Sequence, residues 1–143
     1  MKEILISRDE LLDFYNNVDA TIKSKAKRPF KYLKAFVATK ISLKGVVTEA
    51  MDTLKASTES VQKLQLEHCD RKDGEPVTEM INGVQSYKGL ETNIAFQKAL
   101  KELIEGRDEY LKEELSITVF PVENGYTPDE MTGQECEALM RLI

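Results

Sequence analysis

The chain has 143 residues, of which 41% are hydrophobic and 31% are charged, and its formal net charge is −5 at pH 7. This length suits a single domain over residues 1–143 that can bury a core without a metal or a disulfide. No run of about 18 apolar residues occurs, so we expect no membrane partner. The two cysteines lie far apart, and the N-terminus becomes polar too soon for a signal peptide. We therefore expect free thiols and a cytoplasmic location.

The N-terminal part predicts a short strand followed by a helix. Residues 2–6 alternate apolar and charged side chains and are rich in β-formers, which is typical of a strand. Ser7 stands three residues before Glu10, which is the spacing of a capping box. A first helix is therefore expected from Arg8 to about Lys25, with its apolar side chains on one face.

A long second helix is expected after the Arg28-Pro29 step. Proline disfavours helical geometry in the residue before it and suits the first turn of a new helix. This helix should begin at Pro29 and, if Gly45 does not interrupt it, continue to about His68. Its nearly heptad-spaced apolar stripe consists of Phe30, Leu33, Val37, Val47, Met51, Leu54 and Val61, and it is widened by Phe36, Leu43, Ala50 and Leu64. The first helix is too short to bury such a stripe along its whole length. We therefore expect a third helix, a partner chain, or both to pack against it.

The second half of the chain predicts a hairpin, a third helix, a strand and a short last helix. Asn82-Gly83 between apolar residues is typical of a tight hairpin turn. The third helix is expected over about residues 91–114, and a strand follows at 115–122. Asn124-Gly125 predicts a turn, and Thr132 with Glu135 repeats the capping-box spacing before the last helix.

Together these elements predict an α+β fold that is mostly helical. We expect an antiparallel helical hairpin with a long second helix and a third helix packed alongside it. The N-terminal strand should pair with the strand at 115–122 in a small antiparallel sheet, with the Asn82-Gly83 hairpin as a further candidate member. A short C-terminal helix completes the single domain.

One basic segment lies in an otherwise acidic chain, because eight basic and no acidic residues occur between Asp19 and Glu49. The eight are Lys23, Lys25, Lys27, Arg28, Lys31, Lys34, Lys40 and Lys44. We expect them to form a partner-binding surface, and three interpretations stay open. Acidic residues at 102–130 can balance the segment within the chain, or it can bind an acidic protein surface or a second copy, or it can bind nucleic acid. The single arginine among the eight weighs against nucleic acid.

The sequence carries no recognisable catalytic, cofactor-binding or metal-binding motif. His68 is the single histidine, and it lacks the second cluster of Cys or His residues that a zinc site needs. Glu113-Glu114 is a pair of adjacent carboxylates, which point apart on a helix and are expected to be solvated. No phosphate-binding glycine pattern and no nucleophile elbow occurs. We therefore expect no cofactor, no metal and no enzymatic activity.

The order of the parts resembles that of a known group. A basic helical hairpin at residues 23–44 precedes the Asn82-Gly83 turn, and a helix with a glutamate-rich end leads into a strand at 99–117 before a capped apolar helix at 132–139. In this order the chain resembles a group of small uncharacterised helical proteins encoded by tailed bacteriophages. The resemblance implies a phage or prophage accessory protein in the host cytoplasm, acting in virion assembly or by binding a host protein. It brings no catalytic residues.

The functional hypothesis from the sequence is a non-enzymatic protein-interaction module that self-associates through the long helix. The reason for this hypothesis is the apolar stripe, because leaving several large apolar side chains exposed to water is unfavourable in free energy. The alternative is a nucleic-acid-binding accessory protein that uses the basic segment at residues 23–44.

Overall fold

The computed structural model describes residues 1–123 and 125–143, and it shows an α+β fold that is mostly helical, as predicted. The chain divides into two compact units. The first unit comprises Met1–Met51 and Leu111–Ile143, and the second comprises Asp52–Tyr110. The turn expected at Asn124-Gly125 includes a residue that lies outside the described part.

The first unit contains the predicted sheet. Strand β1 (Lys2–Ser7) pairs antiparallel with β6 (Glu114–Val119), and Ile4 lies opposite Ile117. The hydroxyl oxygen of Ser7 accepts a hydrogen bond from the backbone N–H of Glu10 at 3.2 Å, so the predicted serine cap begins helix α1 (Arg8–Lys23). One side of this ribbon packs on the helices and the other faces solvent, so Ile6 is buried whereas Leu5 is exposed.

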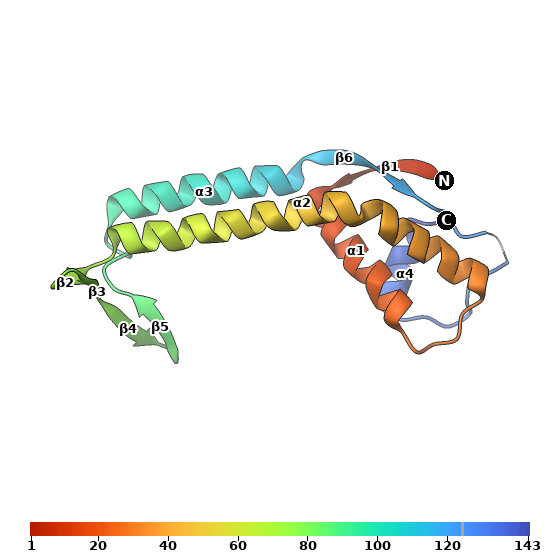
Figure 1. Ribbon diagram of the computed structural model, residues 1–143, viewed down its shortest axis with the longest axis horizontal. Helices are drawn as coiled ribbons and strands as arrows, with labels where there is room; N and C mark the ends of the chain where they lie inside the picture. The colour runs from red at the N-terminus through yellow and green to blue at the C-terminus, as the bar shows by residue number, and fades with distance from the viewer. Residues whose placement is uncertain (124) are drawn as a thin grey trace. The chain divides into compact units, whose positions relative to one another are not determined.

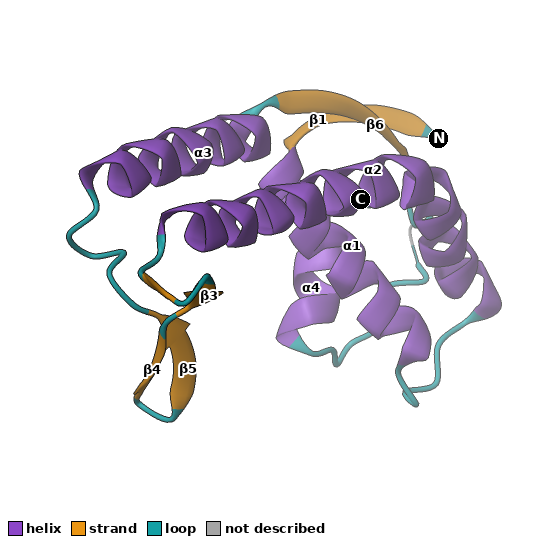
Figure 2. Ribbon diagram, turned by 60° about the vertical axis from the view of Figure 1, so that its left-hand side comes forward, coloured by secondary structure: helices purple, strands orange, loops and turns teal. Residues whose placement is uncertain are grey.

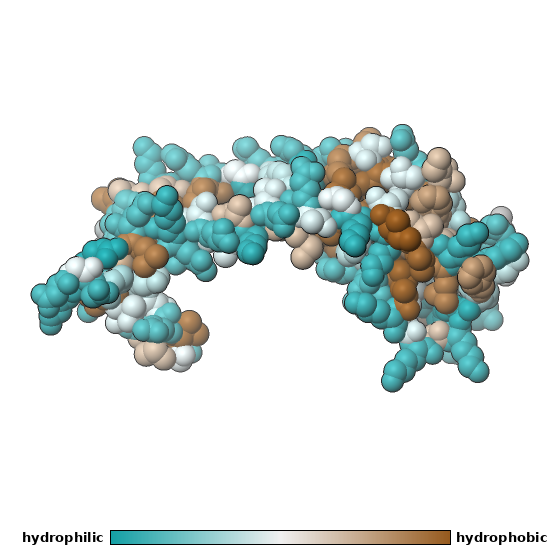
Figure 3. Space-filling model, viewed as in Figure 1, coloured by the Kyte–Doolittle hydropathy of each residue, from teal (hydrophilic) through white to brown (hydrophobic). Residues whose placement is uncertain are grey.

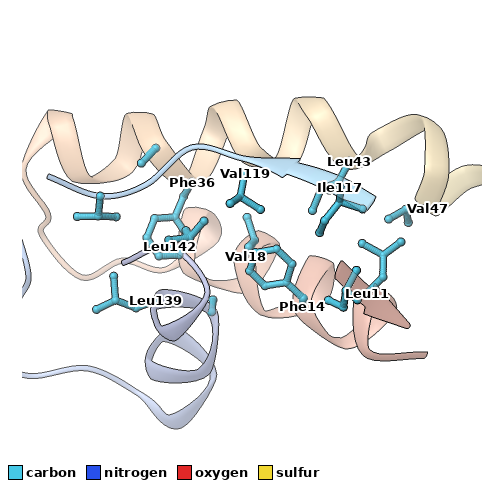
Figure 4. Close-up of a cluster of buried hydrophobic side chains, with 14 of the residues drawn as sticks. Leu11, Phe14, Val18, Phe36, Leu43, Val47, Ile117, Val119, Leu139 and Leu142 are labelled. Atoms are coloured by element: carbon cyan, nitrogen blue, oxygen red, sulfur yellow. The ribbon is translucent and has the colours of Figure 1, made fainter. Parts of the chain in front are cut away.

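Helix α1 and the first part of helix α2 (Phe30–His68) form the predicted antiparallel hairpin, which Figure 1 shows. Figure 4 shows their facing side chains, with those of β6 and the C-terminal segment completing the core. The core side chains include Leu11, Phe14, Val18, Phe36, Leu43, Val47, Ile117, Val119, Leu139 and Leu142. Burying each contributes about 1.5–3 kcal/mol, so this cluster is the main source of stability in the unit.

Helix α2 is one continuous helix of 39 residues that passes through Gly45 without a break. Its buried face matches the predicted stripe in part, because Phe36, Leu43 and Val47 are buried whereas Phe30 and Met51 are exposed. The prediction was wrong for Phe30 and Met51, because α2 carries apolar side chains on two opposite faces. Spacing along a helix groups residues by face but does not reveal which face meets the core.

The C-terminal helix α4 (Gly133–Met140) packs against α1 within the first unit, as Figure 2 shows. The predicted cap is present, since the hydroxyl oxygen of Thr132 accepts from the N–H of Glu135 at 3.2 Å. Beyond the helix, Leu142 is fully buried, and its carbonyl accepts from the N–H of Val122 at 2.6 Å. The end of the chain is therefore fixed to the core.

In the second unit, the part of α2 after Met51 lies beside helix α3 (Ile94–Lys112), which confirms the predicted third helix (Figures 1 and 2). The side-chain oxygen of Asn93 accepts from the N–H of Phe96 at 2.9 Å, and this cap explains why α3 begins a few residues later than predicted. The amide of Asn93 also donates to the carbonyl of His68 at 3.1 Å. One side chain thus connects the end of α2 to the start of α3.

Short strands connect α2 to α3. Strands β2 (Arg71–Lys72) and β3 (Glu75–Pro76) form one ribbon, and β4 (Thr78–Ile81) with β5 (Val84–Tyr87) forms the predicted hairpin. Asn82 and Gly83 have φ angles of 51° and 79°, which suit the predicted type I′ turn. This hairpin is a separate ribbon and does not join the sheet of β1 and β6.

Candidate protein-interaction surface

The basic segment extends over the end of α1, the connection at residues 24–29 and the start of α2. Lys23 lies in the last turn of α1, and Lys25, Lys27 and Arg28 lie in the connection. The remaining members, Lys31, Lys34, Lys40 and Lys44, lie on α2. All eight belong to the first unit. The structure divides them into four that pair within the chain and four that do not.

Asp19 of α1 pairs with two of the lysines. Its carboxylate lies 2.7 Å from Nζ of Lys23 and 2.5 Å from Nζ of Lys40. The hydrogen bonds from Lys23 and then Lys40 lower the pKa of Asp19 below its usual range. Because Lys40 comes from α2 and Asp19 from α1, these contacts hold the hairpin together and leave neither lysine free for a partner.

Lys31 makes a looser contact with the chain itself. Its Nζ lies 3.8 Å from the carboxylate of Glu123 and 5.5 Å from the centroid of the Tyr126 ring. Among the described acidic residues at 102–130, Glu123 is the one that pairs with the basic segment. Acidic residues of the same chain therefore neutralise part of the basic segment, and most of them lie outside residues 102–130.

Arg28 belongs to a buried network that the sequence did not reveal. Its Nε and Nη2 each donate to the carboxylate of Glu135 at 2.8 Å, and Nη2 also donates to the carbonyl of Glu130 at 2.8 Å. The hydroxyl of Tyr32 donates to the same carboxylate at 2.7 Å. The side chains of Arg28 and Glu135 are only 13% and 6% exposed. The network connects the start of α2 to α4.

The charges of this network are fixed by its geometry. The hydrogen bond from Arg28 lowers the pKa of Glu135, with a smaller contribution from Tyr32. Burial, followed by the hydrogen bond to Glu135, raises the pKa of Tyr32 far above its usual range. The carboxylate thus stays charged and the phenol stays neutral over the physiological pH range. A carboxylate that is only 6% exposed and accepts three hydrogen bonds from its own chain connects the start of α2 to α4.

The sequence did not predict the Arg28–Glu135 pair, because the spacing of Thr132 and Glu135 indicates a capping box instead. That spacing predicts that Glu135 bonds back to the backbone near Thr132, whereas its carboxylate binds Arg28 instead. One clue was available, because Arg28 is the single arginine among seven lysines. The planar guanidinium suits a bidentate pair with a carboxylate better than lysine does.

The other four basic residues are available to a partner. Lys25, Lys27, Lys34 and Lys44 are exposed, and none of them has an ion pair with any residue that the structure describes. Lys25 and Lys27 lie in the connection before α2, and Lys34 and Lys44 lie on the helix itself. Half of the predicted surface therefore remains as uncompensated positive charge.

Three exposed apolar side chains lie beside Lys34 and Lys44. Phe30, Val37 and Ile41 are 78%, 41% and 70% exposed. At about 100° of rotation per residue, these five residues fall within about 80° of one another, on the side of α2 opposite its buried residues. We call them the outer face of α2. On the surface seen in Figure 3, hydrophobic side chains gather over the region of α1 and α2.

Other kinds of site find no support in the described residues. No group of three or more His, Cys, Asp or Glu side chains in the described ranges could hold a metal ion. No described helix is long and apolar enough to cross a membrane. Comparison with protein-family models, with curated proteins and with solved structures gives no match.

Proposed function

We propose that this chain is a non-enzymatic protein-interaction module that self-associates through the outer face of α2. One observation carries the proposal: Phe30, Val37 and Ile41 are exposed on one face of one helix, between Lys34 and Lys44, which form no ion pair with a described residue. Single exposed apolar residues are ordinary, whereas a contiguous group rimmed by charges marks a contact surface. Full burial of each would contribute about 1.5–3 kcal/mol to association.

The charges on the outer face decide how two copies can meet. Two identical outer faces cannot pair closely, because Lys34 and Lys44 of one copy would approach the same lysines of the other. An acidic surface of the second copy fits better, and the chain has such surface in excess. Outside the basic segment, 12 basic residues stand against all 25 acidic residues of the chain. Complementary charge would orient the two copies and speed their encounter.

The resemblance to small helical proteins of tailed bacteriophages supports a setting for this activity. In that setting the module acts in the host cytoplasm, in virion assembly or by binding a host protein. A host partner would need an acidic surface with apolar groups to cover the outer face of α2.

Nucleic-acid binding is the second candidate, and one observation favours it. The Phe30 ring is exposed near Lys27 and Lys34, so a base could stack on it while the lysines meet phosphates. Against it, Lys23, Arg28 and Lys40 are held by acidic residues of the chain. Only half of the basic segment is left to neutralise phosphates.

Sedimentation velocity over a wide micromolar concentration range tests the proposal. The wild-type chain should show a mass that rises with concentration, and Ile41→Glu should abolish the rise. Ile94→Glu is the matched control, because Ile94 is also an exposed helical isoleucine, 84% against 70%, and lies in the second unit. A wild-type chain that stays monomeric, or equal behaviour of the two variants, would overturn the proposal. Retention of mixed-sequence single-stranded DNA at low salt, lost in Lys27→Glu, would favour the second candidate.

A further inference from the structure

A groove of about 450 Å³ lies between α1 and α4 in the first unit. The residues that shape it combine acidic walls with apolar surface. They are Glu10, Asp13 and Phe14 of α1, and Glu137, Met140 and Arg141 at α4 and its C-terminal end. The groove is therefore concave, partly apolar and predominantly acidic, so its charge and shape complement the basic and partly apolar outer face of α2.

Two of the acidic residues in the groove, Asp13 and Glu137, form no ion pair with any residue that the structure describes. Arg141 Nη2 donates to the carboxylate of Glu10 at 3.0 Å, so these two charges offset each other. Glu137 accepts only from the neutral amide of Asn17, at 3.3 Å. Asp13 is exposed and forms no ion pair with any described residue. Asp13 and Glu137 thus present two uncompensated negative charges.

We infer that this groove receives the start of α2 and the connection before it from a second copy of the chain, in particular Lys27, Phe30 and Lys34. This inference rests on the proposed self-association and names the surface that meets the N-terminal part of the outer face, Phe30 and Lys34, together with Lys27. The charges are complementary, because two lysines without acidic partners would meet two carboxylates without cationic partners. The apolar groups also match: Phe30 is 78% exposed and Met140 is 70% exposed. A methionine sulfur packs well against an aromatic ring.

The two surfaces are different parts of the chain, so the contact between copies is heterologous. Each copy that uses its groove still presents a free α2 face, and each copy that uses its α2 face still presents a free groove. Such contacts continue into open chains unless the rotation between copies closes a ring. Wild-type assemblies should accordingly grow beyond the dimer as the concentration rises.

A mixing experiment with two complementary variants tests the inference. The double variant Lys27→Glu/Lys34→Glu disables the α2 face and keeps the groove, whereas Asp13→Lys disables the groove and keeps the face. Circular dichroism verifies that both variants are folded, and Asp13 is exposed, so its replacement should leave the fold intact. Each variant alone should associate at least about tenfold more weakly than the wild type. An equimolar mixture should form one-to-one dimers and nothing larger, because one functional groove and one functional face remain per pair.

The outcomes separate this inference from the proposed function. Dimers in the mixture, with each variant monomeric alone, support the groove as the receiving surface. If Lys27→Glu/Lys34→Glu prevents association while Asp13→Lys assembles like the wild type, the groove is not used and the inference is wrong, although the proposed function stands. If the wild type itself stays monomeric at every concentration, both fail. Asp13→Asn, which removes the charge without reversing it, should weaken association less than Asp13→Lys; an equal or larger effect would contradict the electrostatic basis.

Discussion

Replacing Glu135 with alanine should strongly destabilise the first unit. The Glu135 carboxylate is buried and accepts three hydrogen bonds, two from Arg28 at 2.8 Å and one from the Tyr32 hydroxyl at 2.7 Å. Alanine removes the acceptor and leaves the guanidinium of Arg28, only 13% exposed, without its counterion. The phenol of Tyr32 would also lose its acceptor inside the core.

The expected cost follows from the charge that is left behind. Breaking a buried ion pair by removing one partner costs about 3–5 kcal/mol, because the remaining charge is desolvated and unpaired. Arg28 keeps its hydrogen bond to the carbonyl of Glu130, so we expect the lower end, about 3 kcal/mol. The double variant Arg28→Met/Glu135→Leu removes both charges and keeps the apolar volume. It should therefore be more stable than Glu135→Ala, by about 2 kcal/mol.

Urea denaturation measures this difference. The chain has no tryptophan, so tyrosine emission and far-ultraviolet circular dichroism report unfolding. The control is Lys23→Met, which removes an ion pair whose lysine is 72% exposed and should cost less than about 1 kcal/mol. If Glu135→Ala loses no more stability than this control, the buried network does not hold α4 to α2, and the reasoning is refuted.

Three further variants test acid stability and backbone conformation. The pKa of Glu135 in the folded chain is lowered from its ordinary value of 4.5. The charged carboxylate therefore contributes to the free energy of unfolding above pH 4.5, and this contribution is lost as the pH falls through the lower folded pKa. Glu135→Gln should flatten the acid side of the curve of stability against pH, and an unchanged curve would contradict this. Gly89 has a φ of 86° and a Cβ there would collide with Asp70, so Gly89→Ala should lower the free energy of unfolding of the second unit by about 1–3 kcal/mol. Gly45→Ala, in a helix with open space around it, should instead raise stability by up to about 1 kcal/mol in the same denaturation assay; a loss would show that this glycine is needed.

The sequence predicted the elements whose causes are local. The serine cap at Ser7, the threonine cap at Thr132 and the Asn82-Gly83 turn each depend on residues within one turn of chain. The pairing of β1 with β6 was also predicted, because few other segments had the β-forming composition of a sheet partner. Local rules of this kind place elements correctly even when their packing is unknown.

Two features depend on tertiary packing and could not be predicted from the sequence: the buried face of α2 and the pairing of distant residues. Helix α2 has two apolar faces, and only contact with α1 and β6 determines that Tyr32 and Phe36 are buried while Phe30 is exposed. The Arg28–Glu135 pair joins residues 107 positions apart, and no local pattern marks such a distant partner. The candidate surface therefore needed the structure, which showed that four of the eight basic residues are held within the chain and four are not.

Lysine acetylation across a concentration series tests the central claim most directly, because it locates the contact surface on the chain. Lys34 and Lys44 should react more slowly as the concentration rises, since self-association covers the outer face of α2. Lys98, an exposed lysine on α3 in the second unit, should react at the same rate throughout. Unchanged rates at Lys34 and Lys44, in samples whose mass has risen, would show that copies meet elsewhere and would contradict the account.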